Sequence, residues 1–238
     1  ALANHMDPQQ PLYGFQLPKS LRDSPELPSL EELAALYVAE LRVHQPNGPY
    51  LLGGFSMGGA IALEMARHLR EQSQEVALLV LMDTYFPGLQ RRSPSLPRKF
   101  SIHMRYLRDL EGAQRADYIN TRVKKLQKVV PLKRATMASD SGESRKQKWE
   151  QDNAVIQLRR AFARYHVEPY EGTITLFSAR TRFLVADELG AWLKVAKGGI
   201  KQHFVPGTHN AVITEPHVRH VAALLTRCLK QAQSPTNN

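Results

Sequence analysis

The sequence of 238 residues contains a single cysteine, Cys228, so no disulfide can form within the chain. Disulfides are typical of secreted proteins, and a lone thiol fits a reducing compartment, which predicts a cytoplasmic location and a packing role for Cys228. Long hydrophobic runs are missing too, because no apolar stretch approaches the roughly 20 residues that a membrane-spanning helix needs. No secretory signal pattern opens the chain. We therefore expect no association with a membrane.

The remaining composition is that of an ordinary globular protein. Hydrophobic residues make up 42% and charged residues 23% of the chain, which suits one α/β domain with a large core. We predict a single domain over residues 1–238. The chain opens at Ala1 inside a plausible helix, so we expect a domain whose N-terminal part is incomplete.

Positive charge is concentrated in one segment. Residues 90–164 hold 19 Lys and Arg against 7 Asp and Glu, whereas the rest of the chain holds 13 against 15. A basic field of this size attracts acidic partners, although a solvated helical surface would show the same count. No nucleic-acid-binding motif accompanies these charges, so we expect no nucleic-acid partner.

Strand-like and helical patterns alternate along the chain. This alternation predicts an α/β fold with a mostly parallel central sheet flanked by helices. The basic segment reads as amphipathic helices at 100–110, 116–129 and 145–165. It separates two core strands, so we predict that residues 90–164 form a helical lid insertion. The expected strands are 11–16, 50–55, 76–82, 173–177 and 200–205, and the expected helices outside the lid are 29–44, 60–69 and 215–230.

One stretch of the sequence indicates a catalytic site. The run Tyr50-Leu-Leu-Gly-Gly-Phe-Ser-Met-Gly-Gly59 joins an apolar strand to a helical pattern, which is the context of a nucleophile elbow. Gly54 and Gly58 bracket Ser56, where a sharp turn should tolerate little side-chain bulk. We predict that Ser56 is the nucleophile and that the backbone N–H of Met57 stabilises the oxyanion.

A serine nucleophile needs a base and an acid. His209 lies in a loop between the last strand and the final helix, which can return its imidazole to the elbow, whereas His217 and His220 suit packing or surface roles. Two acids follow strands: Asp83 and Asp187. Asp187 could equally cap the next helix, and position alone leaves the choice open.

Three motifs together carry a family resemblance: Gly48 to Gly59, Leu81-Met-Asp-Thr-Tyr-Phe-Pro-Gly88, and Pro206-Gly-Thr-His-Asn210 followed by Glu215-Pro-His-Val218. The chain resembles the chain-releasing thioesterase domains that end nonribosomal peptide and polyketide synthases, within the α/β-hydrolase superfamily. The resemblance implies a triad of Ser56, Asp83 and His209. The family's His-Pro-x-Gly-Gly-like loop, which supplies a second oxyanion donor, has no counterpart here, so that donor is unassigned.

The resemblance further implies an acyl or peptidyl chain presented on the phosphopantetheine of a carrier protein, in an adjacent domain of a larger synthase. Release would occur by hydrolysis or by macrocyclisation, with no cofactor or metal bound by this domain. The basic lid would dock the acidic carrier protein. Tyr85 and Phe86 are candidates for substrate contact, with lid packing as their alternative role.

Three other functions stay open at this point. A free-standing editing (type II) thioesterase would depend on Asp187 in place of Asp83. A carboxylesterase or lipase would turn over oxygen esters equally well. A noncatalytic hydrolase-like binding module would form no acyl-enzyme.

Overall fold

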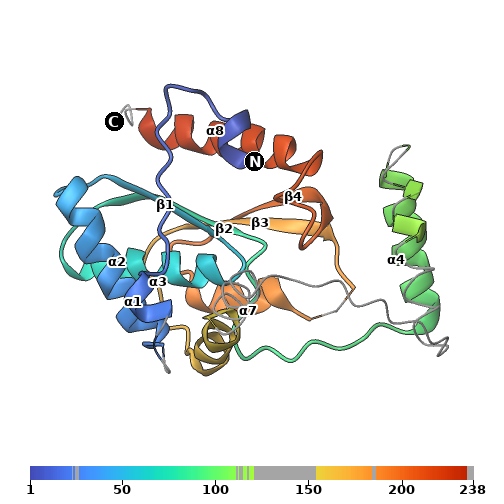
Figure 1. The fold of residues 1–238 in the computed structure, drawn as a ribbon, viewed down its shortest axis with the longest axis horizontal. Helices are drawn as coiled ribbons and strands as arrows, with labels where there is room; N and C mark the ends of the chain where they lie inside the picture. Colours follow the sequence, from blue (N-terminus) through green and yellow to red (C-terminus); the bar gives the residue numbers. More distant parts are fainter. Residues whose placement is uncertain are drawn as a thin grey trace, which may run out of the picture.

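A computed structural model of the chain describes residues 1–22, 24, 27–110, 112, 115–116, 118–120, 154–183 and 186–234. Its centre is a parallel sheet whose four strands lie side by side in chain order (Figure 1). Because all four strands point the same way, the residues that follow them gather at one edge of the sheet. The strands are β1 (Tyr50–Phe55), β2 (Val76–Met82), β3 (Ile174–Thr181) and β4 (Ile200–Thr208).

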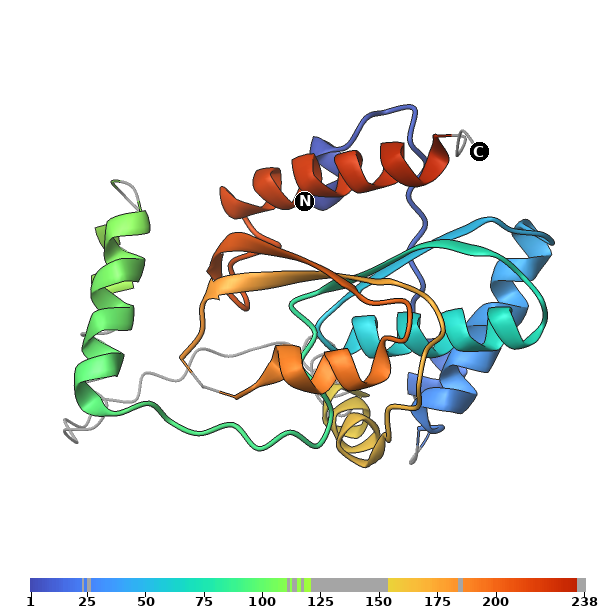
Figure 2. The ribbon, with the colours of Figure 1, turned by 180° about the vertical axis from the view of Figure 1, so that it is seen from behind.

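Helices cover both faces of this sheet, as the two opposite views show (Figures 1 and 2). One face carries α2 (Leu30–His44), α3 (Met57–Glu71) and α7 (Glu188–Val195). The other face carries α8 (His217–Gln233) and the short 3₁₀ helix η1 (Leu2–His5). The fold is therefore the predicted α/β architecture with a parallel sheet between helical layers.

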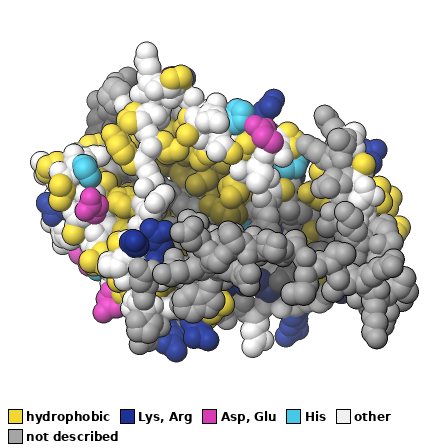
Figure 3. Space-filling view, viewed as in Figure 1, with side chains coloured by type: hydrophobic (Ala, Val, Ile, Leu, Met, Phe, Trp, Pro, Cys, Tyr) yellow, Lys and Arg dark blue, Asp and Glu magenta, His cyan; other side chains and the backbone are white. Residues whose placement is uncertain are grey.

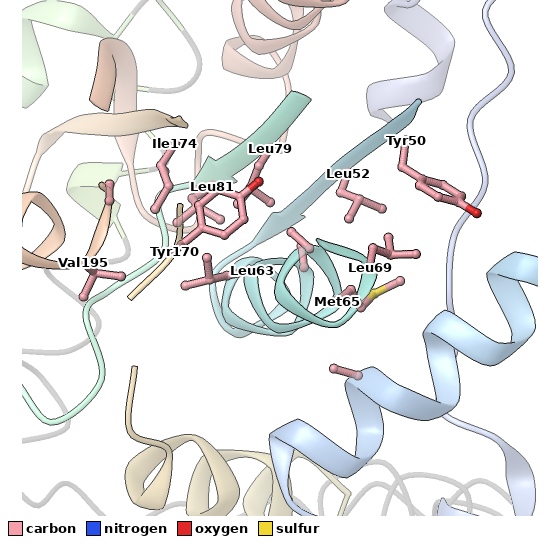
Figure 4. Packing of buried hydrophobic residues seen from close by; sticks show 14 of the residues in the cluster. Tyr50, Leu52, Leu63, Met65, Leu69, Leu79, Leu81, Tyr170, Ile174 and Val195 are labelled. Carbon is pink, nitrogen blue, oxygen red and sulfur yellow. The ribbon is translucent and has the colours of Figure 1, made fainter. Parts of the chain in front are cut away.

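The side chains of β2 alternate between two hydrophobic clusters. Leu79 and Leu81 pack with Leu63 of α3 in the cluster drawn in Figure 4. Val80 points the opposite way and packs with Val221 of α8. Burial of both faces explains why the strand reads as a continuous apolar run in the sequence.

A capping box begins α2 as its sequence predicts. The backbone N–H of Glu32 donates to Ser29 Oγ at 3.1 Å, and the Ser29 N–H donates to Glu32 Oε2 at 2.9 Å. These two bonds satisfy donors that a helix N-terminus otherwise leaves free. The helix then packs along α3, the helix that follows the elbow (Figure 4).

The strand predicted at 11–16 is wrong. This segment is irregular, and Tyr13 is 83% exposed. Its alternating aromatic residues imitate a strand, but among the described residues only Phe15 has a ring partner, Tyr37 of α2, with ring centroids 5.0 Å apart. The segment pairs with no strand in the described part of the chain, and a short helix, α1 (Lys19–Arg22), follows it.

The predicted lid at 90–164 is described in part. Helix α4 (Leu96–Asp109) stands beside the sheet in both views, and residues 154–164 are helical (Figures 1 and 2). Residues 121–153 lie outside the described residues, as do most of the helix predicted at 116–129 and the first part of the one predicted at 145–165. The single domain over 1–238 and the lid insertion both stay predictions.

The surface of the molecule is hollowed on one face. Hydrophobic side chains gather in a hollow at the middle of the face shown in Figure 3. Among the described residues, no helix combines the length and the hydrophobicity that crossing a membrane demands.

Candidate active site

Ser56 occupies a strained turn between β1 and α3. Its backbone has φ 55° and ψ −123°, a combination that non-glycine residues rarely adopt and that costs about 1–3 kcal/mol. The Ser56 N–H donates to the carbonyl of Met82 at 3.0 Å, so the serine stays tied to the end of β2. Met57 is the first residue of α3, where a backbone N–H has no acceptor inside the helix. The turn thus has the geometry of a nucleophile elbow.

Of the two glycines expected to exclude side-chain bulk, Gly54 does so and Gly58 does not. A Cβ on Gly54 would lie 2.1 Å from the carbonyl oxygen of Gly58, so residue 54 must be glycine. A Cβ on Gly58 itself would meet no atom within 4 Å, which corrects the expectation that bulk is excluded there. The tight position is Gly59, whose Cβ would lie 1.8 Å from Oγ1 of Thr84. The close approach is therefore between α3 and the residue after Asp83.

Asp83 follows β2 and is completely buried. Its Oδ1 accepts hydrogen bonds from the Ala179 N–H at 2.9 Å and from Nη2 of Arg182 at 2.6 Å. Its Oδ2 lies 2.8 Å from Nδ1 of His209. The backbone at Asp83 also has a positive φ of 44°, so this residue, like Ser56, is held in an uncommon conformation.

These contacts keep Asp83 ionised. Burial by itself would raise the pKa of Asp83, but the hydrogen bond with His209, the charge of Arg182 and the Ala179 N–H together lower this pKa below its ordinary value. An ionised carboxylate can only accept hydrogen bonds, so Nδ1 of His209 must carry the proton that they share. Nε2 of a neutral His209 is then left as an acceptor, which is the state that a general base requires.

Two aromatic rings stack on the His209 imidazole. The ring of Phe55 stacks on it with centroids 4.8 Å apart, and the ring of Tyr85 stacks with centroids 4.7 Å apart. Phe55 directly precedes Ser56, so the imidazole lies beside the elbow. The Ser56 side chain makes no hydrogen bond to any described residue, and bonds of this kind often tighten only when substrate is bound.

The two candidate substrate contacts face different surroundings. Tyr85 stacks on His209, and the guanidinium of Arg91 lies over the Tyr85 ring, 4.2 Å from its centroid. Phe86 instead packs edge-on against Trp192, with centroids 4.9 Å apart, in the core beneath α7. Only Tyr85 therefore lies at the candidate site, whereas Phe86 serves packing.

Asp187 does what its alternative reading expects. Its carboxylate accepts the Gly190 N–H at 2.9 Å and caps α7. The side chain is exposed and forms no bond with His209. Of the two acids left open by the sequence, Asp83 is the one in contact with His209.

Arg182 was missed by sequence reasoning. It lies directly after β3, 99 residues beyond Asp83, and it pairs with the same carboxylate as His209. Its position after a strand of the same parallel sheet was the available signal, since such positions meet at one edge. Arg91 was missed as well: its Nε donates to the buried Glu188 at 2.8 Å. The same Glu188 accepts the Phe86 N–H at 2.6 Å.

No cluster of three or more histidine, cysteine, aspartate or glutamate side chains suited to a metal ion occurs in the described part of the chain. The groups brought together at the strand ends are a serine, an imidazole and a carboxylate. Their arrangement can perform nucleophilic acyl transfer with proton movement through the imidazole.

Relatives match about a third of the chain. Malpinin synthetase of Mortierella alpina is 43% identical over 83 residues, which are 35% of this chain and 1% of that protein. The dimodular nonribosomal peptide synthase of Bacillus subtilis (strain 168) is 40% identical over 85 residues, 35% of this chain and 4% of that protein. The chain thus corresponds to a small part of the relatives that it matches.

Solved structures share the fold over most of the chain. A four-domain nonribosomal peptide synthetase bound to AMP and glycine has a TM-score of 0.64 and 26% identity, covering 95% of this chain and 18% of that one. The NocB thioesterase domain has a TM-score of 0.57 and 24% identity, covering 87% and 78%. A thioesterase-domain family model matches residues 1–229, and the chain therefore belongs to the thioesterase-domain family.

Proposed function

We propose that this chain is a serine thioesterase that releases an acyl or peptidyl chain from the phosphopantetheine arm of a carrier protein. The observation that carries the proposal is the hydrogen bond between Asp83 and His209, 2.8 Å long, formed beside the strained elbow of Ser56. The synthase names of the relatives support the carrier-bound substrate. The cytoplasmic location expected from the single cysteine remains part of this proposal.

The geometry supports a two-step acyl transfer. Ser56 Oγ attacks the thioester carbonyl carbon while Nε2 of His209 takes the hydroxyl proton. Asp83 holds the imidazole and stabilises the imidazolium that forms. The Met57 N–H donates to the developing oxyanion. Collapse of the tetrahedral intermediate breaks the C–S bond, and the imidazolium proton passes to the departing thiolate.

The second step repeats this chemistry on the acyl-enzyme. Water, or a nucleophile within the acyl chain, gives its proton to His209 and attacks the ester carbonyl. Ser56 Oγ leaves and regains the proton. Water yields an acid and an internal nucleophile yields a ring, and both routes use the same residues.

The editing-thioesterase alternative has less support. It requires the acid near Asp187, and that carboxylate is exposed and engaged in capping α7. The carboxylesterase alternative uses the same residues, so it is separated by substrate: oxygen esters should be turned over far less efficiently than matched thioesters.

The decisive experiment is intact-protein mass spectrometry after incubation with a hexanoyl-pantetheine thioester. We expect a covalent hexanoyl adduct on the wild-type protein and none on Ser56→Ala. Replacing Ser20, an exposed serine of α1, with alanine is the matched control and should leave the adduct intact. Absence of any adduct on the wild type would favour the noncatalytic binding module. An adduct that persists in Ser56→Ala would assign the nucleophile elsewhere.

Docking of the carrier protein is a separate part of the proposal. The positively charged residues of the predicted lid would attract an acidic carrier protein, an effect that salt screens over about 10 Å at 0.1 M. Four of them, Arg122, Lys124, Lys125 and Lys128, lie outside the described residues. Raising ionic strength should lower kcat/KM for a carrier-bound thioester while leaving a small soluble thioester nearly unchanged. An equal loss on both substrates would contradict the docking role.

A further inference from the structure

A cavity of about 490 Å³ lies between α4, the end of β3 and the start of α7. Four arginines line it: Arg98 and Arg105 from α4, and Arg180 and Arg182 from the end of β3. Arg98 and Arg105 are seven residues apart, two helical turns, so they lie on one face of α4. Positive charge from two separate elements thus converges on one space.

Most of this charge has no partner in the described part of the chain. Among the residues that the structure describes, Arg98, Arg105 and Arg180 form no hydrogen bond or ion pair, and only Arg182 pairs with an acid, Asp83. The two carboxylates in the cavity wall are already engaged, since Glu188 pairs with Arg91 and Asp187 caps α7. The cavity therefore keeps an excess of positive charge.

Two further donors on the wall are unsatisfied. Thr181 is 97% buried, and its Oγ1 has no hydrogen-bond partner among the described residues. The buried Nε of Arg182 has no partner within the described ranges either. Buried polar groups are normally hydrogen-bonded, but both of these atoms are shielded from the cavity, so a ligand there would contact the exposed guanidiniums instead.

Two residues of the cavity wall also contact Asp83 of the candidate active site. Arg182 lines it and donates to Oδ1 of Asp83, whose other oxygen contacts His209. Ala179, which gives its N–H to Asp83, lines it too. Apolar side chains of Ile102, Leu189 and Phe204 also line the cavity. A ligand here would place apolar atoms against these side chains and an anion against the guanidiniums.

We propose that this cavity binds a carboxylate carried by the acyl chain, so that the chain released by this domain is acidic. The inference rests on the proposed thioesterase function and names the class of its substrate. Guanidinium groups match carboxylates in a bidentate geometry, and Arg is more weakly hydrated than Lys, which suits a site partly lined by apolar groups. The volume falls in the range of small-molecule pockets.

The test compares three N-acetylcysteamine thioesters of equal chain length. Adipoyl carries a terminal carboxylate, hexanoyl is neutral and 6-aminohexanoyl is cationic. We expect kcat/KM to fall in that order, with adipoyl favoured over hexanoyl by about tenfold to a hundredfold, the range of a charge-assisted hydrogen bond. The double variant Arg105→Gln/Arg180→Gln should lose most of this preference. Both arginines are exposed, so the variant should fold, and its circular dichroism spectrum and unfolding midpoint verify this.

Arg227→Gln is the matched control, because Arg227 is an exposed arginine of α8 on the other face of the sheet, and it should keep the wild-type preference. Binding of adipate monoamide and hexanamide, measured by calorimetry, repeats the comparison without turnover. Equal binding and equal turnover of anionic and neutral chains would overturn the proposal.

The same series separates the anion of the acyl chain from the phosphate of the pantetheine arm. If the double variant loses activity toward hexanoyl-coenzyme A but not toward any N-acetylcysteamine thioester, the cavity holds the arm and the proposal is wrong. Failure of all three thioesters to acylate Ser56 would instead refute the proposed function. In that case the calorimetric comparison still decides whether the cavity prefers an anion.

Discussion

Two adjacent glycines at the start of α3 provide a sharp test of the elbow geometry. An ideal Cβ on Gly58 would meet nothing within 4 Å, whereas one on Gly59 would lie 1.8 Å from Thr84 Oγ1 and 2.9 Å from Thr84 Cβ. The two positions share a helix turn and differ by one residue. Alanine at either position adds the same methyl group, which enters open space at residue 58 and a crowded contact at residue 59.

Gly58→Ala should stabilise the protein. Alanine in a helix is favoured over glycine by about 0.5–1 kcal/mol, and no atom opposes the added methyl. Gly59→Ala should lower the free energy of unfolding by about 1–3 kcal/mol, the usual cost of overpacking. It should also slow turnover, since Thr84 follows Asp83 directly. A displacement of about 1 Å at a catalytic group can cost a hundredfold in rate.

Urea unfolding followed by circular dichroism measures the two stabilities, and turnover of a soluble thioester measures the displacement. Thr84→Ala supplies a rescue, because it removes the oxygen that Gly59→Ala would strike. Thr84 Oγ1 is buried without a partner among the described residues, so removing it sacrifices no hydrogen bond there. The double variant Gly59→Ala/Thr84→Ala should recover part of both losses. Equal damage from Gly58→Ala and Gly59→Ala, or no recovery in the double variant, would refute this account of the elbow.

Three further outcomes are expected. Asp83→Asn should lower kcat by about 10⁴, because the acid fixes the imidazole tautomer of His209, whereas Asp187→Asn should change steady-state turnover less than about twofold, since Asn caps a helix as well as Asp. Tyr165→Phe should lower the free energy of unfolding in urea by about 1.5–3 kcal/mol, because its hydroxyl donates at 2.7 Å to the buried carboxylate of Glu64. The lowered pKa of Asp83 means that its stabilising contribution is present above the unfolded carboxyl pKa near 4 and is lost as pH falls. The urea midpoint of the wild type should therefore drop more steeply on acidification from about pH 5 than that of Asp83→Asn, and parallel curves would contradict this sign.

Sequence patterns predicted the features that depend on neighbouring residues. The capping box of Ser29 and Glu32 is a three-residue relation, and both of its hydrogen bonds are present. The elbow at Ser56 likewise follows from a strand, a short turn and a helix in succession. The parallel sheet was predictable because apolar strands alternate with helices.

Sequence patterns did not predict the contacts between segments that are distant in the chain. Motif spacing pointed to Gly58, but the tight position is set by Thr84, 25 residues after Gly59 in the chain. The ion pair between Arg182 and Asp83 depends on which residues of β2 and β3 lie side by side. This register cannot be predicted from the sequence of either strand alone. The aromatic alternation at 11–16 misled because a strand also needs a neighbour that accepts its hydrogen bonds.

The site depends on the register of the whole sheet, since each of its four strands delivers one polar group. Ser56 follows β1, Asp83 follows β2, Arg182 follows β3 and His209 follows β4. The backbone ladder continues into the first two of these residues: Ser56 N–H donates to the Met82 carbonyl, and Asp83 N–H donates to the Phe177 carbonyl at 2.7 Å. A shift of one residue between β2 and β3 would move the Asp83 carboxylate away from both Arg182 and His209, because alternate residues of a strand face opposite sides. The buried apolar side chains that hold the strands in this register therefore also determine where these four polar groups lie, just as the stacking of Tyr85 positions the imidazole.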